Sequence, residues 1–359
     1  MQAVRYHGLH DVRYETVPTP IIQAPDHILI EPWWCGICGS DLGEYVHGPS
    51  AVPTTTCHPI TKEKCPVVLG HEFAGYVIEV GSAVTKIKPG DKVCSSAIIR
   101  CEKCYFCKIN EPNKCVQLGF LGLSGFGGGM SQRVVIPQVM AYKLPDHLDL
   151  RLGALMEPLA VSYHGVMNTG IGPGQTALVL GAGPIGLCVL YGLKIRGVSK
   201  IIVSEPSEQR RKLAEDLGAL TIDPAKTKVS RQVKSWNNGI GADASFDCSG
   251  VPSTLDDGLT GIRPGGTFMI LALIKKPTTV NFARVQYFEK SIKGGVCYTD
   301  EEFEEVINAV GTGVIDPSPL ITSEIHGKDA DALGFKELAR ANPEQIKILV
   351  TTRPLESNL

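Results

Sequence analysis

The chain lacks the features that mark a nucleic-acid-binding or membrane protein. Its 35 lysine and arginine residues are balanced by 37 acidic residues, which gives a formal net charge of −2. A nucleic-acid-binding protein needs a basic face to neutralise phosphates, so this balance argues against one. No apolar run approaches the roughly 20 residues of a membrane span. The opening MQAVRYHGLHDVRYE also lacks the apolar core of a signal peptide. We therefore expect no nucleic-acid partner, no membrane partner and a cytoplasmic location.

Internal repeats and low-complexity segments are also absent from the sequence. A chain of 359 residues is long enough for about two domains, each with its own hydrophobic core. Hydrophobic residues make up 43% of the chain and charged residues 20%, which is typical of a soluble globular protein.

The first 150 residues or so read as short strands separated by glycine- and proline-containing corners. The clearest candidates are HILIEPWW (27–34), EFAGYVIEV (72–80), DKVCSSAII (91–99) and SQRVVIP (131–137). This pattern predicts a β-rich, barrel-like domain.

From about Ala154 onwards, strands alternate with helices. The sequence predicts a strand, a glycine turn and a helix over 176–197, then a strand over 200–206 and a helix over 207–218. Strands over 244–250 and 265–273 follow, and such alternation predicts a parallel sheet covered on both faces. The tail adds a helix over 299–313 and a strand over 345–352 that could return to the first domain.

Four of the twelve cysteines lie within fifteen residues, spaced C-x2-C-x2-C-x7-C. Four thiolates can close a tetrahedral shell around one Zn2+ and leave no position for a substrate, which indicates a structural site. A pair of disulfide-linked hairpins is the alternative, but a reducing cytoplasm disfavours it. The four candidate ligands are Cys101, Cys104, Cys107 and Cys115.

A glycine-rich turn follows the apolar strand Ala177–Leu180 and opens the helix Leu187–Lys194. In that context G-x-G-x-x-G indicates a dinucleotide site, because backbone N–H groups can approach a pyrophosphate at the helix N-terminus. The residues of the turn that we expect to bind the cofactor are Gly181, Gly183, Pro184, Ile185 and Gly186.

Glu205 ends the next strand and can accept both ribose hydroxyls of the adenosine half. Its charge would repel a 2′-phosphate, so NAD is favoured over NADP. Arg210 and Arg211 complicate that choice, because a guanidinium could also meet such a phosphate. We count Arg210 among the cofactor-binding candidates.

A second set of metal ligands can be drawn from Cys38, His71, Glu72 and Glu157. A thiolate, an imidazole and a carboxylate would leave one position of a catalytic zinc open for substrate. Each residue taken singly also has an ordinary interpretation: Cys35 or Cys38 as a buried thiol, His71 at a strand end, Glu157 at a helix start.

The motifs GICGSD, GHEFAGYVIEVG and KPGDKV, the four-cysteine loop, GAGPIG and SEPSEQRR occur in the order seen in zinc-dependent medium-chain alcohol and polyol dehydrogenases. The resemblance covers essentially the whole chain. Within that superfamily, LGEYVHGP, HPITKEKCPVVLGHE, GLSGFGGGM and EPLAVSYHGV look most like the 2,3-butanediol dehydrogenases.

The resemblance implies an α/β protein with a GroES-like catalytic domain over 1–160 and 297–359. A Rossmann domain, a doubly wound parallel sheet, is implied over 161–296. It implies two zinc ions and NAD for each chain, and a homodimer or homotetramer. Its ligands for the catalytic zinc are Cys38 rather than Cys35, His71, and Glu157 as the third ligand.

The resemblance also assigns roles beside the metal. Glu72 lies next to the catalytic zinc in such enzymes and is a candidate ligand in a resting state. Ser40 takes the proton of the substrate and passes it outward. Similar enzymes often carry a histidine where this chain has Gly43, so His47, Tyr45 or water would have to complete the outer relay. Met130 and Ser131 also depart from the usual pocket residues.

These observations predict an oxidoreductase that interconverts a vicinal diol and its hydroxyketone with NAD. A sorbitol- or xylitol-type polyol dehydrogenase, or another secondary alcohol dehydrogenase, is the alternative within the enzymes. Two other classes stay open at this point: a non-enzymatic zinc-binding interaction module, and a structural protein that binds NAD(P)H without turnover.

Overall fold

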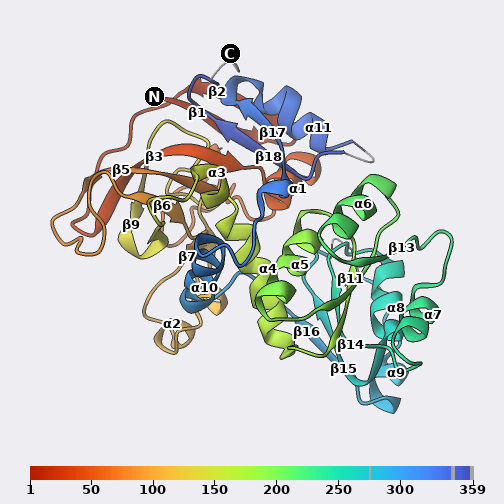
Figure 1. Cartoon of the computed structure of the whole chain (residues 1–359). Helices are drawn as coiled ribbons and strands as arrows, with labels where there is room; N and C mark the ends of the chain where they lie inside the picture. Colours follow the sequence, from red (N-terminus) through yellow and green to blue (C-terminus); the bar gives the residue numbers. More distant parts are fainter. Residues whose placement is uncertain (275, 341–343, 356–359) are drawn as a thin grey trace. The chain divides into compact units, whose positions relative to one another are not determined.

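The computed structural model describes residues 1–274, 276–340 and 344–355. None of the helices in these residues is long and apolar enough to cross a membrane. The chain forms two compact units, each described here by itself (Figure 1). The first unit comprises Met1–Glu157, Thr299–Thr312 and Asp316–Leu359, and the second comprises Pro158–Tyr298 and Gly313–Ile315. The expected boundaries at 160 and 296 differ from these by a few residues.

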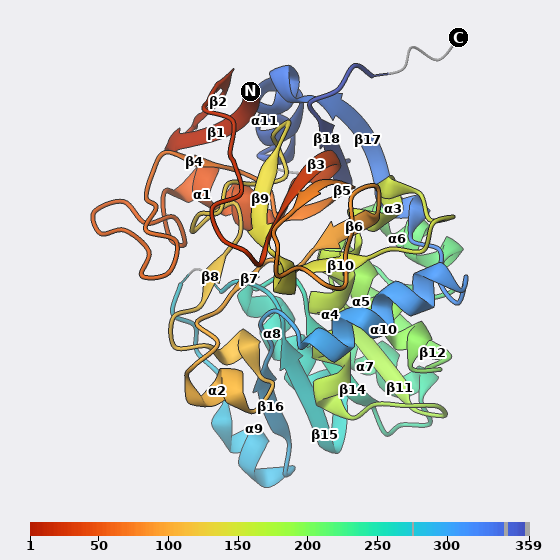
Figure 2. The same ribbon diagram turned by 90° about the vertical axis from the view of Figure 1, so that its left-hand side faces the viewer.

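The largest sheet of the first unit has the strand order β10-β6-β5-β3-β18-β17, and β9 also pairs with β3. The strand expected near the C-terminus is confirmed, because β18 pairs antiparallel with β3, near the start of the chain (Figure 2). The strands are β3 (His27–Gly36), β5 (Glu72–Val80), β6 (Lys92–Ser95), β9 (Val134–Pro137), β10 (Ala141–Lys143), β17 (Ile321–His326) and β18 (Lys347–Thr351).

A three-stranded sheet and a two-stranded sheet complete the β structure of the first unit. The three-stranded sheet has the order β2-β1-β4, and the smaller one pairs β7 with β8. Their bounds are β1 (Gln2–Gly8), β2 (Asp11–Thr16), β4 (Val67–Val68), β7 (Ile98–Ile99) and β8 (Gly119–Phe120).

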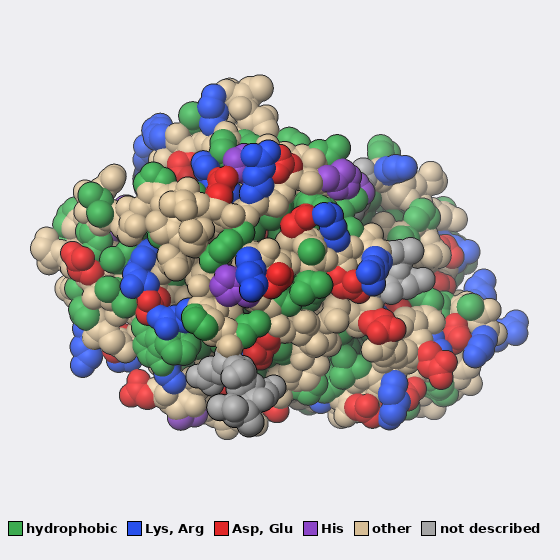
Figure 3. All heavy atoms as spheres, turned by 90° about the horizontal axis from the view of Figure 1, so that it is seen from above, with side chains coloured by type: hydrophobic (Ala, Val, Ile, Leu, Met, Phe, Trp, Pro, Cys, Tyr) green, Lys and Arg blue, Asp and Glu red, His purple; other side chains and the backbone are tan. Residues whose placement is uncertain are grey.

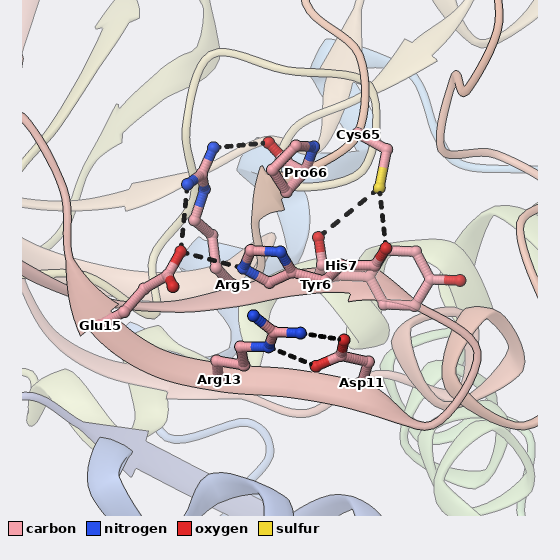
Figure 4. A network of polar contacts seen from close by, with 8 residues as sticks. All are labelled: Arg5, Tyr6, His7, Asp11, Arg13, Glu15, Cys65 and Pro66. Carbon is pink, nitrogen blue, oxygen red and sulfur yellow. Dashed lines mark hydrogen bonds and ion pairs between the residues drawn. The ribbon is translucent and has the colours of Figure 1, made fainter.

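Ion pairs and hydrogen bonds tie the β1–β2 hairpin together (Figure 4). The Arg5 guanidinium and the His7 ring each lie 3.0 Å from a carboxylate oxygen of Glu15. Arg5 also donates to the carbonyl oxygen of Pro66 at 3.0 Å. The Cys65 thiol lies 3.4 Å from the His7 carbonyl oxygen. Partly exposed pairs of this kind contribute little free energy, so the network mainly fixes how the hairpin and the 65–66 segment meet.

The first unit also contains helices, most of them short. Helix α1 was not expected, because Gly39 and Gly43 each lower the helix propensity of this segment by about 1 kcal/mol relative to alanine. The helix expected over 299–313 is confirmed as α10, which Thr299 caps by accepting a hydrogen bond from the Glu302 N–H. The helical elements are α1 (Gly39–His47), α2 (Tyr105–Lys108), η1 (Pro112–Lys114), η2 (Gln138–Met140), α3 (Leu150–Gly153), α10 (Asp300–Gly311), η3 (Ser318–Leu320), η4 (Gly327–Asp329), the π-helix η5 (Ala330–Phe335) and α11 (Lys336–Leu338).

A six-stranded, fully parallel sheet forms the centre of the second unit, with the order β13-β12-β11-β14-β15-β16. In chain order this is 3-2-1-4-5-6, the doubly wound arrangement of dinucleotide-binding domains, so the expected parallel sheet is confirmed. The strands are β11 (Thr176–Leu180), β12 (Lys200–Ser204), β13 (Leu220–Ile222), β14 (Ala242–Asp247), β15 (Ile262–Ile270) and β16 (Ser291–Gly294).

Helices cover both faces of this sheet: α5 and α6 lie on one side, and α7 and α8 lie on the other (Figure 1). Each unit buries its own apolar core, the first around Ile28, Ile30 and Phe73 and the second around Leu178 and Phe268. The helices are α4 (Met156–Thr169), α5 (Pro184–Ile195), α6 (Glu208–Asp216), α7 (Val229–Trp236), α8 (Pro252–Gly261) and α9 (Phe282–Tyr287).

Candidate metal and dinucleotide sites

The four predicted structural ligands form one cluster of free thiols, which we call the four-cysteine cluster: Cys101, Cys104, Cys107 and Cys115. Their sulfur atoms all lie within 4.8 Å of one another. The Cys104 sulfur is 3.6 Å from that of Cys107 and 4.0 Å from that of Cys115. Tetrahedral zinc with Zn–S bonds of about 2.3 Å requires sulfur atoms about 3.8 Å apart. The cluster therefore fits a zinc ion, and its spacing is far too long for disulfide bonds of about 2.05 Å.

Backbone N–H groups stabilise negative charge on these sulfur atoms. The Cys115 sulfur accepts hydrogen bonds from the N–H groups of Cys101 at 3.3 Å and Gln117 at 3.4 Å. The N–H groups of Cys107 and Val116, acting on the Cys104 sulfur, lower the pKa of that thiol to about 6. Burial has the opposite effect on two other thiols of the cluster: it raises the pKa of Cys115 and raises that of Cys107 to about 12. A thiolate is the form that binds zinc, so these two thiols lose their protons when a metal binds.

A second group of ligand atoms, which we call the mixed cluster, joins Cys38, His71 and Glu72 within 4.8 Å of one another. Cys38 precedes the first turn of α1, and its N–H donates to the Asp41 carboxylate at 3.0 Å. Glu72 begins β5, directly after His71. Residues far apart in the chain thus meet, and His71 and Glu72 are 4% and 1% exposed.

Negative charge surrounds the His71 ring. Burial alone would lower the pKa of His71, but the charges of Asp41, Cys38 and Glu157 outweigh it and hold that pKa well above its usual range. The Nδ1 atom lies 3.6 Å from an Asp41 oxygen, and both atoms are buried without a hydrogen-bond partner. A carboxylate behind a ligating imidazole is the usual support of a metal-bound histidine. The mixed cluster therefore suits a cation such as zinc.

Glu157, our predicted third ligand, is not among the atoms of the mixed cluster. It lies in the first turn of α4, is 5% exposed, and its charge acts on His71. Glu72 occupies the carboxylate position of the cluster instead. The choice between these two carboxylates stays a prediction.

Two charged residues of this neighbourhood were missed by the sequence reasoning. Asp41 directly follows Ser40, and it is fully buried. Lys347, from β18, is 3% exposed, and its Nζ lies 2.8 and 2.6 Å from the two Glu72 carboxylate oxygens. The sequence signal for Lys347 was a lysine at the start of the strand Lys347–Thr351, ahead of three aliphatic residues.

The Oγ atom of Ser40 is 3.2 Å from the Nε2 atom of His71, and its role as proton acceptor stays a prediction. A Cβ atom added at Gly43 would meet nothing within 4 Å, so the space of the missing histidine is open. Tyr45 is a poor substitute, because its hydroxyl donates to Asp331 at 2.9 Å. Burial, together with that hydrogen bond, raises the pKa of Tyr45 to about 12.

The unusual pair Met130 and Ser131 is fully buried. The Met130 side chain packs against Gly70, where an added Cβ would come within 2.9 Å of its Cγ. The Ser131 hydroxyl donates to the carbonyl oxygens of Gly128 and Arg133 at 2.7 and 2.8 Å. These two residues therefore support the backbone behind His71.

The glycine turn of the second unit, the predicted pyrophosphate site, is closely packed. Gly181 has φ +103°, and a Cβ there would meet the Ser249 hydroxyl at 2.3 Å. A Cβ at Gly186 would meet the Gly181 carbonyl oxygen at 1.9 Å. Gly183 precedes α5, with Pro184 at its first position. The first and third glycines of the turn are thus sterically required.

Glu205 reaches back to this turn from the end of β12. Its carboxylate accepts hydrogen bonds from the N–H groups of Ala182 at 2.7 Å and Ser207 at 2.9 Å, and the residue is 5% exposed. The side chain of Arg210 also comes near the turn, 3.8 Å from the position of a Cβ at Gly183. The Arg211 guanidinium donates instead to the carbonyl oxygens of Glu205 and Pro206.

The doubly wound sheet with its glycine turn, and the β-rich unit with two thiol-containing clusters, define a zinc- and dinucleotide-dependent dehydrogenase. Residues 24–146 match the family model for the alcohol dehydrogenase GroES-like domain, and residues 184–312 match that for zinc-binding dehydrogenase. The chain belongs to the zinc-dependent alcohol dehydrogenases, a family of oxidoreductases. The expected GroES-like and Rossmann domains are thereby confirmed.

Individual relatives match over nearly the whole chain. The (R,R)-butanediol dehydrogenase of Saccharomyces cerevisiae is 36% identical over 376 residues, covering 98% of each chain. The enzyme of the same name from Bacillus subtilis is 37% identical over 350 residues, covering 98% of this chain and 99% of that one. A crystal structure of 2R,3R-butanediol dehydrogenase from Bacillus subtilis superposes with a TM-score of 0.91 at 36% identity, covering 98% of this chain and 99% of that one. A probable D-xylulose reductase of Aspergillus fumigatus is 34% identical, covering 92% of this chain and 91% of the relative.

Proposed function

We propose that this protein interconverts (R,R)-2,3-butanediol and acetoin, using NAD and a catalytic zinc. The observation that carries the proposal is the buried thiol, imidazole and carboxylate of the mixed cluster. It occurs in a chain that resembles (R,R)-butanediol dehydrogenases over 98% of its length. A vicinal diol and its hydroxyketone differ by two hydrogen atoms, which leave as a hydride to NAD and a proton to solvent.

The proposed ligands of the catalytic zinc are Cys38, His71 and a carboxylate, with Glu157 as our first choice. The four-cysteine cluster would hold the second, structural zinc. When bound, the catalytic zinc acts as a Lewis acid on the substrate hydroxyl, and NAD accepts the hydride.

Within this proposal, Ser40 receives the proton of the substrate hydroxyl. Its position 3.2 Å from His71 Nε2 puts a hydroxyl beside the expected ligand atom. Asp41 keeps the imidazole oriented from the far side, at 3.6 Å. The open space at Gly43 allows water to carry the proton onward.

In the dinucleotide site, the N–H groups of the glycine turn at the start of α5 would bind the pyrophosphate, and Glu205 would accept the ribose hydroxyls. Each Glu205 oxygen already accepts one backbone hydrogen bond, which orients the carboxylate beside the turn. A carboxylate oxygen can accept more than one hydrogen bond, so both remain able to receive a hydroxyl. These contacts support a preference for NAD.

We also propose a homodimer or homotetramer in the cytoplasm. The edge strand β16 is largely exposed, and apolar side chains accompany it in the second unit: Leu273, Phe282 and Tyr287 are 69%, 67% and 82% exposed. An unpaired strand edge with apolar neighbours supports pairing with another copy. The sulfur spacing of the four-cysteine cluster, which suits a metal and not disulfides, supports a reducing compartment.

The function is tested by following NADH with acetoin and with the separate butanediol stereoisomers. We expect the (R,R)-diol to give the highest kcat/KM among the diols. Sorbitol and xylitol belong in the same assay, because the xylulose reductase relative supports a polyol dehydrogenase as the second candidate. A kcat/KM higher for xylitol or sorbitol than for every butanediol isomer would replace the first proposal with the second.

A further inference from the structure

Lys347 is a buried lysine that no part of the proposed mechanism uses. It begins β18 and is 3% exposed, whereas lysines in folded proteins almost always keep their ammonium group in water. Its Nζ contacts both carboxylate oxygens of Glu72, at 2.8 and 2.6 Å, and donates to the Ile37 carbonyl oxygen at 3.2 Å. A charge buried in this way requires compensation, and here the compensation is Glu72.

Three neighbouring strands form the pocket that holds this pair. Gly36 on β3 lies opposite Glu72 on β5, and Leu349 on β18 lies opposite Gly36 on the other side. A Cβ atom at Gly36 would come within 2.2 Å of a Glu72 oxygen and 3.1 Å of the Lys347 Cδ. The missing side chain of Gly36 therefore makes room for the ion pair.

Glu72 faces two partners at once. One of its oxygens lies within 4.8 Å of the ligand atoms of Cys38 and His71, while both oxygens bind the ammonium group of Lys347. A carboxylate between a metal site and a lysine is drawn to both charges. The lysine therefore competes with any metal for Glu72.

We propose that Lys347 is a positioning residue that holds Glu72 beside the catalytic metal rather than on it. The charge balance supports this role. Asp41 and Glu157 already act electrostatically on His71, so the site holds carboxylates besides Glu72, and Lys347 is the cation that contacts Glu72. Without the lysine, the buried Glu72 carboxylate has only the metal to neutralise it, and it moves into the position that substrate must occupy.

Replacement by methionine tests this role, because Lys347→Met keeps an unbranched side chain only one atom shorter and removes its charge. The protein is prepared with zinc in the four-cysteine cluster and Co2+ in the mixed cluster. The visible absorption of the cobalt then reports how many ligands it has. In Lys347→Met we expect a weaker cobalt band, from an added carboxylate ligand, and roughly tenfold slower release of the metal to a chelator. Lys347→Arg should keep the spectrum of the parent.

The double variant Lys347→Met/Glu72→Gln should regain the parental cobalt spectrum, since it removes both charges. If Lys347→Met alone does not fold, the cobalt spectrum of the double variant still tests the role of Lys347. Lys143→Met, which breaks the 2.8 Å pair between the exposed Lys143 ammonium group and the buried Asp91, is the matched control and should change neither measurement. An unchanged spectrum and release rate in Lys347→Met, or a double variant that differs from the parent, would overturn the role of Lys347.

This inference rests on the metal assignment in the proposed function, but the cobalt measurements need no substrate. A parent enzyme that oxidises no diol yet shows the expected spectral changes would refute the proposed substrate and leave the role of Lys347 standing. A parent that binds metal only in the four-cysteine cluster would refute both the catalytic metal and the role of Lys347.

Discussion

The two thiol-containing clusters of the first unit are built in opposite ways. The four-cysteine cluster comes from one loop of fifteen residues, and its thiols are stabilised by backbone N–H groups of the same loop. The mixed cluster joins the start of α1 to the start of β5, and its surroundings include Lys347 from near the end of the chain. A local loop can bind a metal without help from the fold, whereas the mixed cluster exists only once the sheet has formed.

The two clusters also differ in how deeply their side chains are buried. Three of the four cysteines in the loop cluster are partly exposed. His71, Glu72 and Asp41 are almost completely buried, and pairs of charged side chains, Asp41 with His71 and Lys347 with Glu72, meet there. Burial strengthens electrostatic interactions, which favours chemistry at the mixed cluster and stability at the other. On the surface drawn in Figure 3, basic and acidic side chains are interspersed.

The largest effect should come from removing a proposed ligand of the mixed cluster. Glu157→Ala should lower kcat by about 1,000-fold, because a loss of several kcal/mol of transition-state stabilisation is expected when the metal is lost or misplaced. Metal content and turnover check the prediction together. Cys35→Ala is the matched control, since the Cys35 sulfur is fully buried and packs against Gly70. Full activity of Glu157→Ala with loss of activity in Glu72→Gln would make Glu72 the true third ligand.

Removing a ligand of the four-cysteine cluster should instead affect stability. Cys104→Ser should lower the free energy of unfolding by about 3 kcal/mol or more, a fraction of the roughly 10–16 kcal/mol that zinc contributes to small zinc-folded peptides. Elemental analysis should fall from two zinc ions for each chain to one. Cys57→Ser, at an exposed cysteine outside both clusters, should change neither value. If Cys104→Ser is as stable as the parent, the loop does not hold a structural metal.

The dinucleotide site is partly local and partly formed by the fold. Its glycines lie in one turn, whereas Glu205 reaches that turn from the end of the next strand. We expect an intermediate effect there. Glu205→Ser should shift the ratio of kcat/KM for NAD over NADP by about 10- to 100-fold toward NADP, since an unpaired polar group costs roughly 1–3 kcal/mol. Glu205→Gln separates charge from hydrogen bonding and should shift the ratio less. The same ratio in parent and both variants would show that another residue selects the cofactor.

The smallest effect should come from filling the open space beside the mixed cluster. Gly43→His should raise the rate of diol oxidation below neutral pH by less than about tenfold, far below the 10²–10⁴ of a direct acid–base group. The pH dependence of the oxidation rate, measured in parent and variant, checks this prediction. The same measurement on His47→Gln tests whether that exposed histidine already serves the relay. A loss of rate in Gly43→His would mean that the space is needed for water or substrate.

Much of the fold was predictable because its signals are local. The strand 72–80 was expected where β5 lies, and the parallel sheet of the second unit was expected from the alternation of strands and helices. Helix α1 was missed, because its two glycines hide a helix that tertiary packing stabilises. The helix carries Ser40 and Asp41, so the missed element is also the one that organises the mixed cluster.

The sequence by itself determined the four-cysteine cluster, the glycine turn and the family, since spacing over a few residues fixes each of these motifs. Only the tertiary structure decided that Glu72, and not Glu157, lies within 4.8 Å of the Cys38 and His71 ligand atoms, that Asp41 lies behind the imidazole, and that Lys347 binds Glu72. These contacts join residues as many as 275 positions apart. Spacing along the chain carries no information about them, because they arise from the pairing of β18 with β3 and of β3 with β5.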